Sequence, residues 1–570
     1  MILNLSLNTI LPSNAFDTLK EISYTKVDEF NSLIARISEH QSKNLNWWVE
    51  RPSTRNTLQS PLYYRFCCLY LVRDLIQAGT SLDKVIVDSH AMLTVIRELK
   101  ERKSYNFEIE GPAKGPPHFH NYFLKSLKPF FVSLKRLVMQ LIASKKTKHL
   151  SPEPPKEDLI LIDQFVLPGF ITEQRYYNGL WDALSPQQKE KTFFVPTLVM
   201  MKEEEFEPAY RALRTSERNF LIKEDYLTFF DLLYSLFHIF LVWFIKPESE
   251  EVLGVDFSRL VREELIRAGY ENAIIGLLNY HFARCLRKKS FSLSLVVDWW
   301  EGQPLDKGWN LGFHTFFPNT LRKGYIGYAP RTMELQLWPS DSEIKYGVAP
   351  PIIATIGNKF SIEMNATKQP FKAETAPAFR FGHLWGNGSI SEKNSESFRI
   401  LLALSIKVDE SIRILEQVID SGLIEDDQMK FILKPHPTVQ FDTLKKRMGD
   451  NWSSRFQESE NSTPEEIRSS DLLITGMSSV GLEAVVMGVP AIIVEILSGL
   501  AFDPIPESVP RDLWRSCRSS NEIFEIVNSF RNRTQEEVKQ HQEMSAAIKN
   551  DYFEPVTEEA VQRFLNLQSN

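Results

Sequence analysis

Residues 471–484 read Asp471-Leu472-Leu473-Ile474-Thr475-Gly476-Met477-Ser478-Ser479-Val480-Gly481-Leu482-Glu483-Ala484, an apolar run followed by small and hydroxyl residues and then a helical pattern. A short continuous apolar run bounded by turn residues is typical of a strand buried on both faces of a parallel sheet. We therefore predict a strand at 472–475, a helix at 479–487 and, after Gly488-Val489-Pro490, a second strand at 491–494. This order predicts a Rossmann-like unit.

The neighbouring sequence extends that unit towards its N-terminus. Apolar runs at 398–404 and 429–433 predict two more strands, and 410–421 predicts a helix between them. In the first half of the chain, similar runs at 85–88, 159–163, 192–199 and 293–298 alternate with helical stretches. That alternation predicts a second doubly wound α/β domain.

The domain boundaries follow from composition. The segment 374–396 is dense in Pro, Gly, Asn and Ser, which is typical of a linker. We predict an N-terminal domain at 1–385, a C-terminal Rossmann-like domain at 386–545, and a final segment, 546–570, whose helix packs back on the first domain. The predicted fold class is α/β.

Composition narrows the functional classes. The 570 residues carry a net charge of −7, which argues against a general nucleic-acid binder. Cys67, Cys68, Cys285 and Cys517 have no metal-ligand spacing, so we expect reduced thiols in a cytoplasmic protein. Residues 1–12 lack the basic region and cleavage site of a secretory signal.

Two apolar segments interrupt the α/β pattern. Residues 121–150 combine apolar side chains with several lysines, and this pattern fits either a basic amphipathic helix on an anionic membrane surface or a solvated helix. Residues 226–245 are the most hydrophobic part of the chain, but they contain Asp231 and His238. Because a charge in the bilayer is costly, we expect a buried or interfacial helix there.

Two motifs have the chemistry of an anion site. Lys434-Pro435-His436-Pro437 directly follows a predicted strand, where open α/β sheets bind ligands. Thr475, Gly476, Ser478 and Ser479 lie between the next strand and the start of its helix, where free N–H groups and the helix dipole favour phosphates. The alternatives are a rigid loop with an incidental histidine and ordinary helix capping. By the usual topology, we expect the two strand ends to be neighbours.

Together these motifs resemble the donor-binding half of GT-B glycosyltransferases. Lys-Pro-His-Pro after a strand, then Ser-Ser-x-x-x-Glu-Ala and Gly-x-Pro, is similar to bacterial enzymes of capsule and lipopolysaccharide synthesis. These enzymes include CMP-Kdo transferases, sialyltransferases with His-Pro and Ser-Ser motifs, and CDP-glycerol glycerophosphotransferases. The resemblance implies GT-B architecture, two Rossmann-like domains that face a central cleft.

A third stretch supports the resemblance. Residues 297–308, with Glu301-Gly302-Gln303-Pro304, and 323–328, with Ile326-Gly327-Tyr328, resemble a segment of surface carbohydrate biosynthesis proteins. In that family Gln-His follows the tyrosine. This chain has Ala329-Pro330 instead, so no role of that histidine carries over. The resemblance covers roughly residue 159 to the C-terminus.

The resemblance implies the roles of the donor site. Lys434 and His436 would neutralise the leaving phosphate, Ser478 and Ser479 would bind its oxygens, and Glu483 would anchor the ribose. A CMP-linked sugar such as CMP-Kdo is the favoured donor, with no other cofactor and no metal. The acceptor would be a saccharide or lipid-linked saccharide, and the enzyme would lie in the cytoplasm or at the cytoplasmic face of the inner membrane.

The acceptor side requires a carboxylate at a strand end. The candidates, in order, are Glu301, Asp163 and Asp298, and helix capping or turn formation is the alternative for each. Arg175 and Tyr176 are candidates for lining the acceptor side. Two other functions stay open: a nucleotide-sugar 2-epimerase, and a non-catalytic scaffold of a polysaccharide assembly complex.

Overall fold

The computed structural model describes residues 1–112, 119–267, 269–367, 369–386 and 397–567, and they form two compact units. Unit 1 consists of 1–380 and 554–570, and unit 2 of 381–553. The last helix, α22 (Glu558–Phe564), therefore belongs to unit 1. Of the predicted linker, 374–386 holds the end of strand β11 and the 3-10 helix η6 (Phe379–Trp385), and 387–396 lies outside the described residues.

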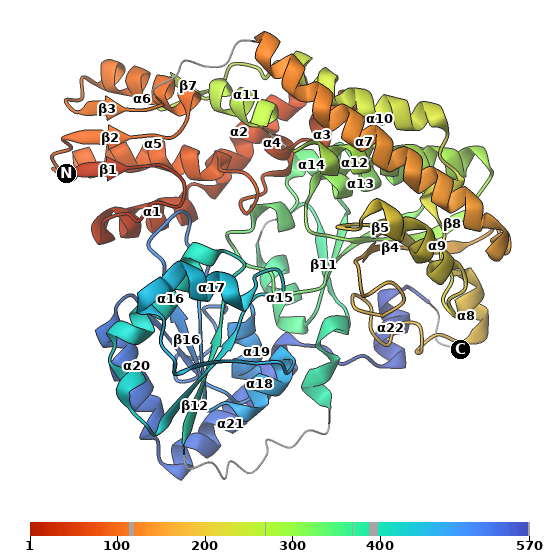
Figure 1. The fold of residues 1–570 in the computed structure, drawn as a ribbon. Helices are drawn as coiled ribbons and strands as arrows, with labels where there is room; N and C mark the ends of the chain where they lie inside the picture. The colour runs from red at the N-terminus through yellow and green to blue at the C-terminus, as the bar shows by residue number, and fades with distance from the viewer. Residues whose placement is uncertain (113–118, 268, 368, 387–396, 568–570) are drawn as a thin grey trace. The chain divides into compact units, whose positions relative to one another are not determined.

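Unit 1 begins with a small parallel sheet of order β1-β2-β3 (Figure 1). Its strands are β1 (Ile2–Asn4), β2 (Lys84–Ile86) and β3 (Glu108–Glu110). The strand predicted at 85–88 exists as β2, and the helix after it is α6 (His90–Lys103), capped by Ser89. The prediction that this strand joins the doubly wound sheet is wrong, because β2 pairs with β1 and β3 in this separate sheet.

The main sheet of unit 1 has six parallel strands in the order β11-β10-β9-β8-β4-β5. Their bounds are β4 (Leu159–Val166), β5 (Thr192–Leu198), β8 (Leu293–Trp299), β9 (Leu321–Ile326), β10 (Ile352–Thr355) and β11 (Lys372–Thr375). Chain order reverses between β4 and β8, so their carboxyl ends form the topological switch point at which α/β sheets bind ligands.

Long helices cover this sheet. The core joins β4, β5 and β8 to α10 (Phe229–Leu241), α12 (Tyr270–Lys288) and α13 (Pro304–Phe316). The helices α12 and α13 approach closely because Gly308 faces Gly276: a Cβ on Gly308 would lie 1.9 Å from the Gly276 carbonyl oxygen. The other helices of unit 1 are α1 (Ser13–Thr25), α2 (Val27–His40), α3 (Leu45–Trp48), α4 (Arg51–Thr54), α5 (Leu62–Gln77), α7 (Phe119–Thr147), α8 (Pro186–Lys191), α9 (Phe206–Arg214), α11 (Ser258–Arg267), α14 (Asp341–Lys345) and α15 (Asn358–Ala366).

Unit 2 has a second sheet of six parallel strands, in the order β14-β13-β12-β15-β16-β17 (Figure 1). The strands are β12 (Phe398–Ala403), β13 (Met429–Lys434), β14 (Phe456–Glu458), β15 (Leu472–Thr475), β16 (Ala491–Val494) and β17 (Trp514–Cys517). The helices are α16 (Val408–Asp420), α17 (Phe441–Met448), α18 (Thr463–Ser469), α19 (Val480–Val486), α20 (Ser520–Arg531) and α21 (Gln535–Tyr552). The predicted fold class, α/β with two Rossmann-like domains, is confirmed by the two parallel sheets.

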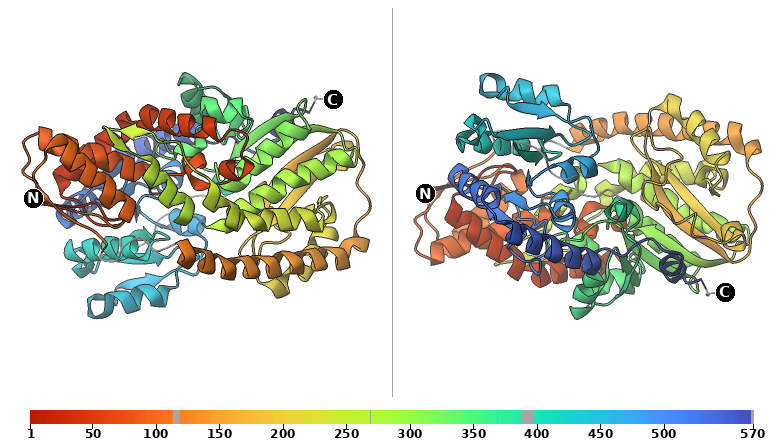
Figure 2. Two further views of the ribbon diagram at one scale, coloured as in Figure 1. Left: turned by 90° about the horizontal axis from the view of Figure 1, so that it is seen from above. Right: turned by 90° about the horizontal axis from the view of Figure 1, so that it is seen from below.

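The two apolar segments are helical. The segment 121–150 comprises most of α7, which runs along the outside of unit 1 in both views of Figure 2, and the short 3-10 helix after it. The segment 226–245 contains α10 and the 3-10 helix η4 (Val242–Phe244). Among the described residues, no helix is both long enough and apolar enough to cross a membrane. The four cysteines are buried free thiols.

Candidate functional site

The switch point of unit 1 gathers the three predicted carboxylates. Asp163 lies in β4, Asp298 lies in the adjacent strand β8, and Glu301 follows β8 by two residues. The structure also adds a carboxylate that the sequence analysis missed, Asp306 in the first turn of α13. The pattern Gln303-x-x-Asp306 is a capping box, a signal that could have revealed its position.

Asp163 is buried, and neither of its carboxylate oxygens makes a hydrogen bond of ordinary geometry. Burial raises the pKa of Asp163 to about 6, and the nearby charge of Lys223 opposes that rise. Lys223 is itself buried, and its ammonium group donates to Thr197 Oγ1 and Asn279 Oδ1, both at 2.7 Å. No sequence signal marked Lys223, because only the folded chain brings it beside β4.

Asp298 and Asp306 are also fully buried. Asp298 Oδ2 accepts from Asn310 Nδ2 at 2.5 Å, and Asp306 Oδ2 accepts from the backbone N–H groups of Glu301 and Gln303. Burial raises the pKa of both carboxyls well above the usual range, and like-charged carboxyls nearby add to the shift. Asp306 fits helix capping because it accepts from two backbone N–H groups at the start of α13. Burial favours the neutral form of Asp298, which makes it a weaker base candidate than Glu301.

Glu301 is the half-buried member of the group. Its Oε1 accepts from Trp299 Nε1 at 2.9 Å, and its Oε2 accepts from Gln303 Nε2. The turn behind it requires Gly302, which has a φ of +63° and whose added Cβ would lie 2.2 Å from the carbonyl oxygen of Gln336. Burial raises the pKa of Glu301, and the positive charge of Arg380 opposes the rise.

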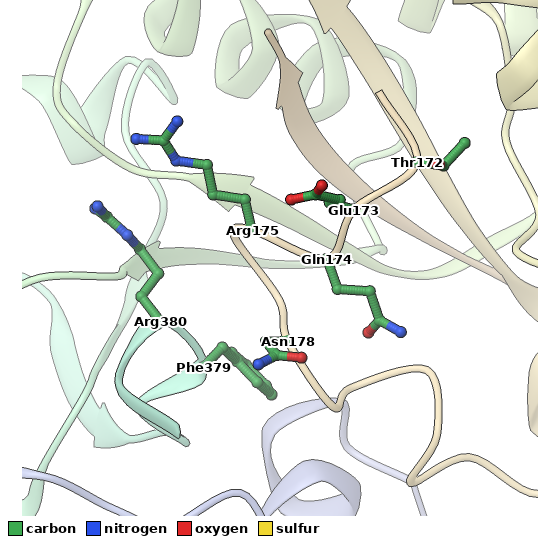
Figure 3. Close-up of a pocket in the computed structure, with 7 residues that line it drawn as sticks. All are labelled: Thr172, Glu173, Gln174, Arg175, Asn178, Phe379 and Arg380. Atoms are coloured by element: carbon green, nitrogen blue, oxygen red, sulfur yellow. The ribbon is translucent and has the colours of Figure 1, made fainter. Parts of the chain in front are cut away.

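An open pocket in unit 1 includes Arg380. It has a volume of about 430 Å³ and is lined by Thr172, Glu173, Gln174, Arg175, Asn178, Phe379 and Arg380. Figure 3 shows the guanidinium groups of Arg175 and Arg380 on the same side of the pocket. Arg175, predicted to line the acceptor side, therefore lines a pocket, whereas Tyr176 packs its ring on Trp299 with centroids 4.6 Å apart.

The predicted anion site in unit 2 lies on strands that are not neighbours. The motif at 434–437 follows β13 and the motif at 475–479 follows β15, and β12 lies between these two strands. The expectation of neighbouring strand ends is therefore wrong. Two strand spacings of about 4.8 Å separate the motifs, a distance of the order of 10 Å. The chain order reverses between β12 and β15, so the second motif lies at the switch point.

The lysine and the histidine of the first motif differ in their surroundings. The Lys434 ammonium group donates to the backbone carbonyls of Asn461 and Ser459, so it is anchored at the base of the loop. His436 Nδ1 lies 2.8 Å from Thr438 Oγ1 and accepts from the Thr438 backbone N–H at 3.3 Å. In the neutral ring this places the proton on Nε2.

The helix that follows the second motif is shorter and less well capped at its N-terminus than the sequence predicts. Helix α19 has only seven residues, and Ser479 is its N-cap residue but makes no side-chain capping bond. Ser478 Oγ accepts weakly from the Val480 N–H at 3.4 Å, and both serines are partly exposed. The Thr475 hydroxyl is buried and donates to the carbonyl oxygen of Ala403 at 2.7 Å, so it stabilises the sheet.

Two carboxylates flank this loop. Glu410, in the first turn of α16, accepts from Ser405 Oγ at 3.0 Å and from the Met477 N–H at 3.4 Å, and it lies so close to Gly476 that an added Cβ would meet it at 2.6 Å. Glu483 Oε2 lies 3.3 Å from His383 Nε2. Glu410 was not among the predicted residues, because nothing in the sequence relates the start of α16 to residue 476.

No protein-family model matches the chain, and no curated protein matches it. Solved structures do match. MnaA of S. aureus, in a co-structure with UDP, is 10% identical with a TM-score of 0.42, and the match covers 72% of this chain and 98% of that one. A putative UDP-N-acetylglucosamine 2-epimerase from Listeria monocytogenes is 12% identical, with a TM-score of 0.42 and coverage of 72% and 95%.

A third solved structure is the glycosyltransferase SnogD from Streptomyces nogalater, which is 10% identical with a TM-score of 0.37 and coverage of 72% and 99%. Because these three TM-scores lie below 0.5, the matches carry no argument about function. The fold assignment rests on the strand orders of the two sheets.

Proposed function

We propose that this chain is a glycosyltransferase that moves a sugar from a nucleotide-activated donor to a growing surface polysaccharide or lipopolysaccharide. The observation that carries the proposal is the position of Glu301. It is a half-buried carboxylate at the carboxyl end of a switch-point strand, and Arg380, which lines the open pocket, is its electrostatic neighbour. The sequence resemblance favours a CMP-linked sugar such as CMP-Kdo as the donor.

In unit 1, Glu301 acts as the general base. Its two oriented hydrogen bonds fix the carboxylate, and its raised pKa brings it closer to the working pH, where a base accepts a proton most effectively. It removes the proton from an acceptor hydroxyl as the oxygen bonds to the anomeric carbon, while the nucleotide leaves with its phosphate. Arg175 and Arg380 fit an anionic group of the acceptor, and Asn178 fits its hydroxyls.

In unit 2, His436 donates from Nε2 to a phosphate oxygen of the donor, and the hydroxyls of Ser478 and Ser479 bind further oxygens. The Glu410 carboxylate would repel a phosphate at Gly476, so we assign that position to a ribose hydroxyl that donates a hydrogen bond to Glu410. If the contact between Glu483 and His383 breaks, the Glu483 carboxylate accepts a second hydrogen bond from the ribose. Lys434 supplies positive charge from behind the loop, and the proposed reaction uses these groups in place of a metal.

Nucleotide binding is the first test. A ligand that binds only the native state raises its apparent stability, by about 2.7 kcal/mol at a hundredfold excess over Kd. We expect CMP or CDP to raise the melting temperature, and His436→Ala to abolish the increase, while the exposed control His149→Ala retains it. An unchanged increase in His436→Ala would remove this histidine from the site.

Sugar transfer is the second test. We expect Glu301→Gln to retain the nucleotide-induced increase in melting temperature and to lose transfer of labelled sugar to acceptor. Stabilisation by UDP together with epimerisation of a UDP-sugar without acceptor would replace the proposal with the epimerase alternative. Absence of stabilisation by CMP, CDP and UDP alike would favour the scaffold.

A further inference from the structure

A helix on a water-exposed surface normally turns its apolar side chains inward and its polar side chains outward. The helix α10 has the opposite arrangement. Its polar side chains point inward: Asp231 pairs with Arg284, and His238 Nε2 lies 2.6 Å from Glu50 Oε1. Its outward positions are apolar instead. Phe230, Tyr234, Phe237, Leu241 and, in η4, Phe244 follow one another at intervals of three and four residues, and all are exposed. This spacing places them in one stripe.

The stripe continues onto α7. The ring of Phe130 lies 6.0 Å from Phe237 and 5.4 Å from Phe240, so the two helices pack side by side through aromatic side chains. Beyond this contact, Phe131 and Val132 of α7 point outward. Phe230 is 80% exposed, Phe244 71% and Phe131 61%. Single exposed apolar residues are ordinary, but a contiguous group of this size marks an interaction surface.

Charge indicates what covers this surface. Lys128 lies one turn from Phe131 and Val132, and Lys246 follows Phe244 by two residues; both are exposed and have no ion pair among the described residues. Further along the chain, Lys145 of α7 and Lys148 of the 3-10 helix η1 (Lys148–Leu150) are exposed as well. The one acid in the α10 sequence, Asp231, is buried. Aromatic side chains bordered by lysines match an anionic bilayer, in which the rings enter the acyl boundary and the ammonium groups meet the phosphates.

We propose that the outward face of α10, η4 and α7, here called the aromatic face, docks unit 1 onto an anionic lipid surface. The sequence left a membrane surface open for 121–150 and an interfacial position open for 226–245; in the structure α10 supplies most of the apolar side chains, and the basic border combines Lys128 of α7 with Lys246 after η4. The inference is consistent with a lipid-linked acceptor, but it stands independently of the sugar-transfer proposal, because lipid binding requires no nucleotide.

The experiment is co-sedimentation of the full chain with vesicles of equal parts phosphatidylglycerol and phosphatidylcholine, compared with phosphatidylcholine alone. We expect the wild type to bind the anionic vesicles. The triple variant Phe230→Ser/Phe237→Ser/Phe244→Ser should partition at least about tenfold more weakly, because three exposed rings lose their burial in lipid. A matched control, Ile362→Ser/Ile406→Ser, also removes exposed apolar side chains but lies outside the aromatic face, and it should bind like the wild type.

The basic border is tested separately. Lys128→Gln/Lys246→Gln should weaken binding to the anionic vesicles by roughly thirtyfold, and the loss should shrink as salt rises. Equal partitioning of wild type and triple variant would overturn the proposal. The proposal would also be overturned if the wild type bound neither kind of vesicle but formed dimers and the triple variant did not. The aromatic face would then bind a second copy of the chain. Nucleotide-induced stabilisation of the triple variant should be unchanged, which separates this test from that of the donor site.

Discussion

Glu343→Gln should destabilise unit 1 more than most single substitutions. Glu343 lies between two cations: Arg55 Nη2 donates to its Oε2 at 2.5 Å, and Lys307 donates to its Oε1. All three side chains are at most 2% exposed. Removing the carboxylate charge leaves two buried cations without compensation, which typically costs about 3–5 kcal/mol.

Urea unfolding measures the loss. With an m-value of roughly 3 kcal/mol/M, the midpoint of the unit 1 transition should fall by about 1–1.7 M. The matched control is Lys307→Met, which leaves the Arg55–Glu343 pair balanced and should cost much less. The double variant, Lys307→Met/Glu343→Gln, leaves one unpaired cation instead of two, so it should be more stable than Glu343→Gln alone.

Acid conditions add a second readout. The charges of Arg55 and Lys307 lower the pKa of Glu343 from 4.5 to about 2. A depressed carboxyl pKa contributes stability that is present above the unfolded-state value and is lost as the pH falls through the folded-state value. The gap between wild type and Glu343→Gln should therefore narrow between about pH 4.5 and 2. A loss below about 1 kcal/mol at neutral pH would refute the reasoning, because the carboxylate would then not be compensating buried charge.

Three further predictions concern the candidate site. Gly302→Ala should destabilise unit 1 by more than about 1 kcal/mol and reduce transfer, because the new methyl group meets the carbonyl of Gln336; an unchanged urea midpoint would contradict this. The kcat/KM of the wild type should fall on the acid side with a midpoint above 4.5, the usual pKa of glutamate, since the raised pKa of Glu301 governs its basic form; a midpoint at or below 4.5 would exclude it as the base. The pKa of Asp163 is raised from 3.8 to about 6, so the stability that its protonated carboxyl contributes should be fully present below the lower value and lost as the pH rises through the higher one; the urea midpoint of Asp163→Asn should therefore rise relative to that of the wild type across this range, and a constant difference would contradict this.

The strands that could be predicted from the sequence were those with continuous apolar runs. The predictions at 472–475 and 491–494 match β15 and β16 residue for residue. Strand β9 was missed because two charged residues and a glycine interrupt the apolar pattern of its sequence, Leu-Arg-Lys-Gly-Tyr-Ile. The buried position of Lys323 in this strand is explained only by the fold. Its ammonium group donates to the carbonyl oxygen of Phe564 at 2.9 Å, a residue far along the chain. Contacts of this kind leave no local pattern to predict.

The sequence predicted the types of residue in the candidate site better than it predicted their arrangement in space. His436 and Glu301 could be predicted because ligands of parallel sheets bind at carboxyl ends and polar residues there stand out against apolar runs. Asp163 was predicted at such an end as well, but β4 continues to Val166, so Asp163 lies inside the strand. The spatial order of strands carries no such signal, which is why β12 between the two unit 2 motifs was unexpected. Glu410 and Arg380 were missed because they reach their neighbours through tertiary contacts alone.

The return of α22 to unit 1 determines the order in which the chain can mature on the ribosome. Unit 1 includes 554–570, so unit 2 is an insertion within it and its whole sequence is synthesised earlier. The ring of Phe564 lies 5.3 Å from Tyr325 and 5.6 Å from Phe379, and without it this aromatic cluster is open to water. Nascent unit 2 can therefore reach its native state first, while the N-terminal part of unit 1 stays incomplete until α22 has been synthesised.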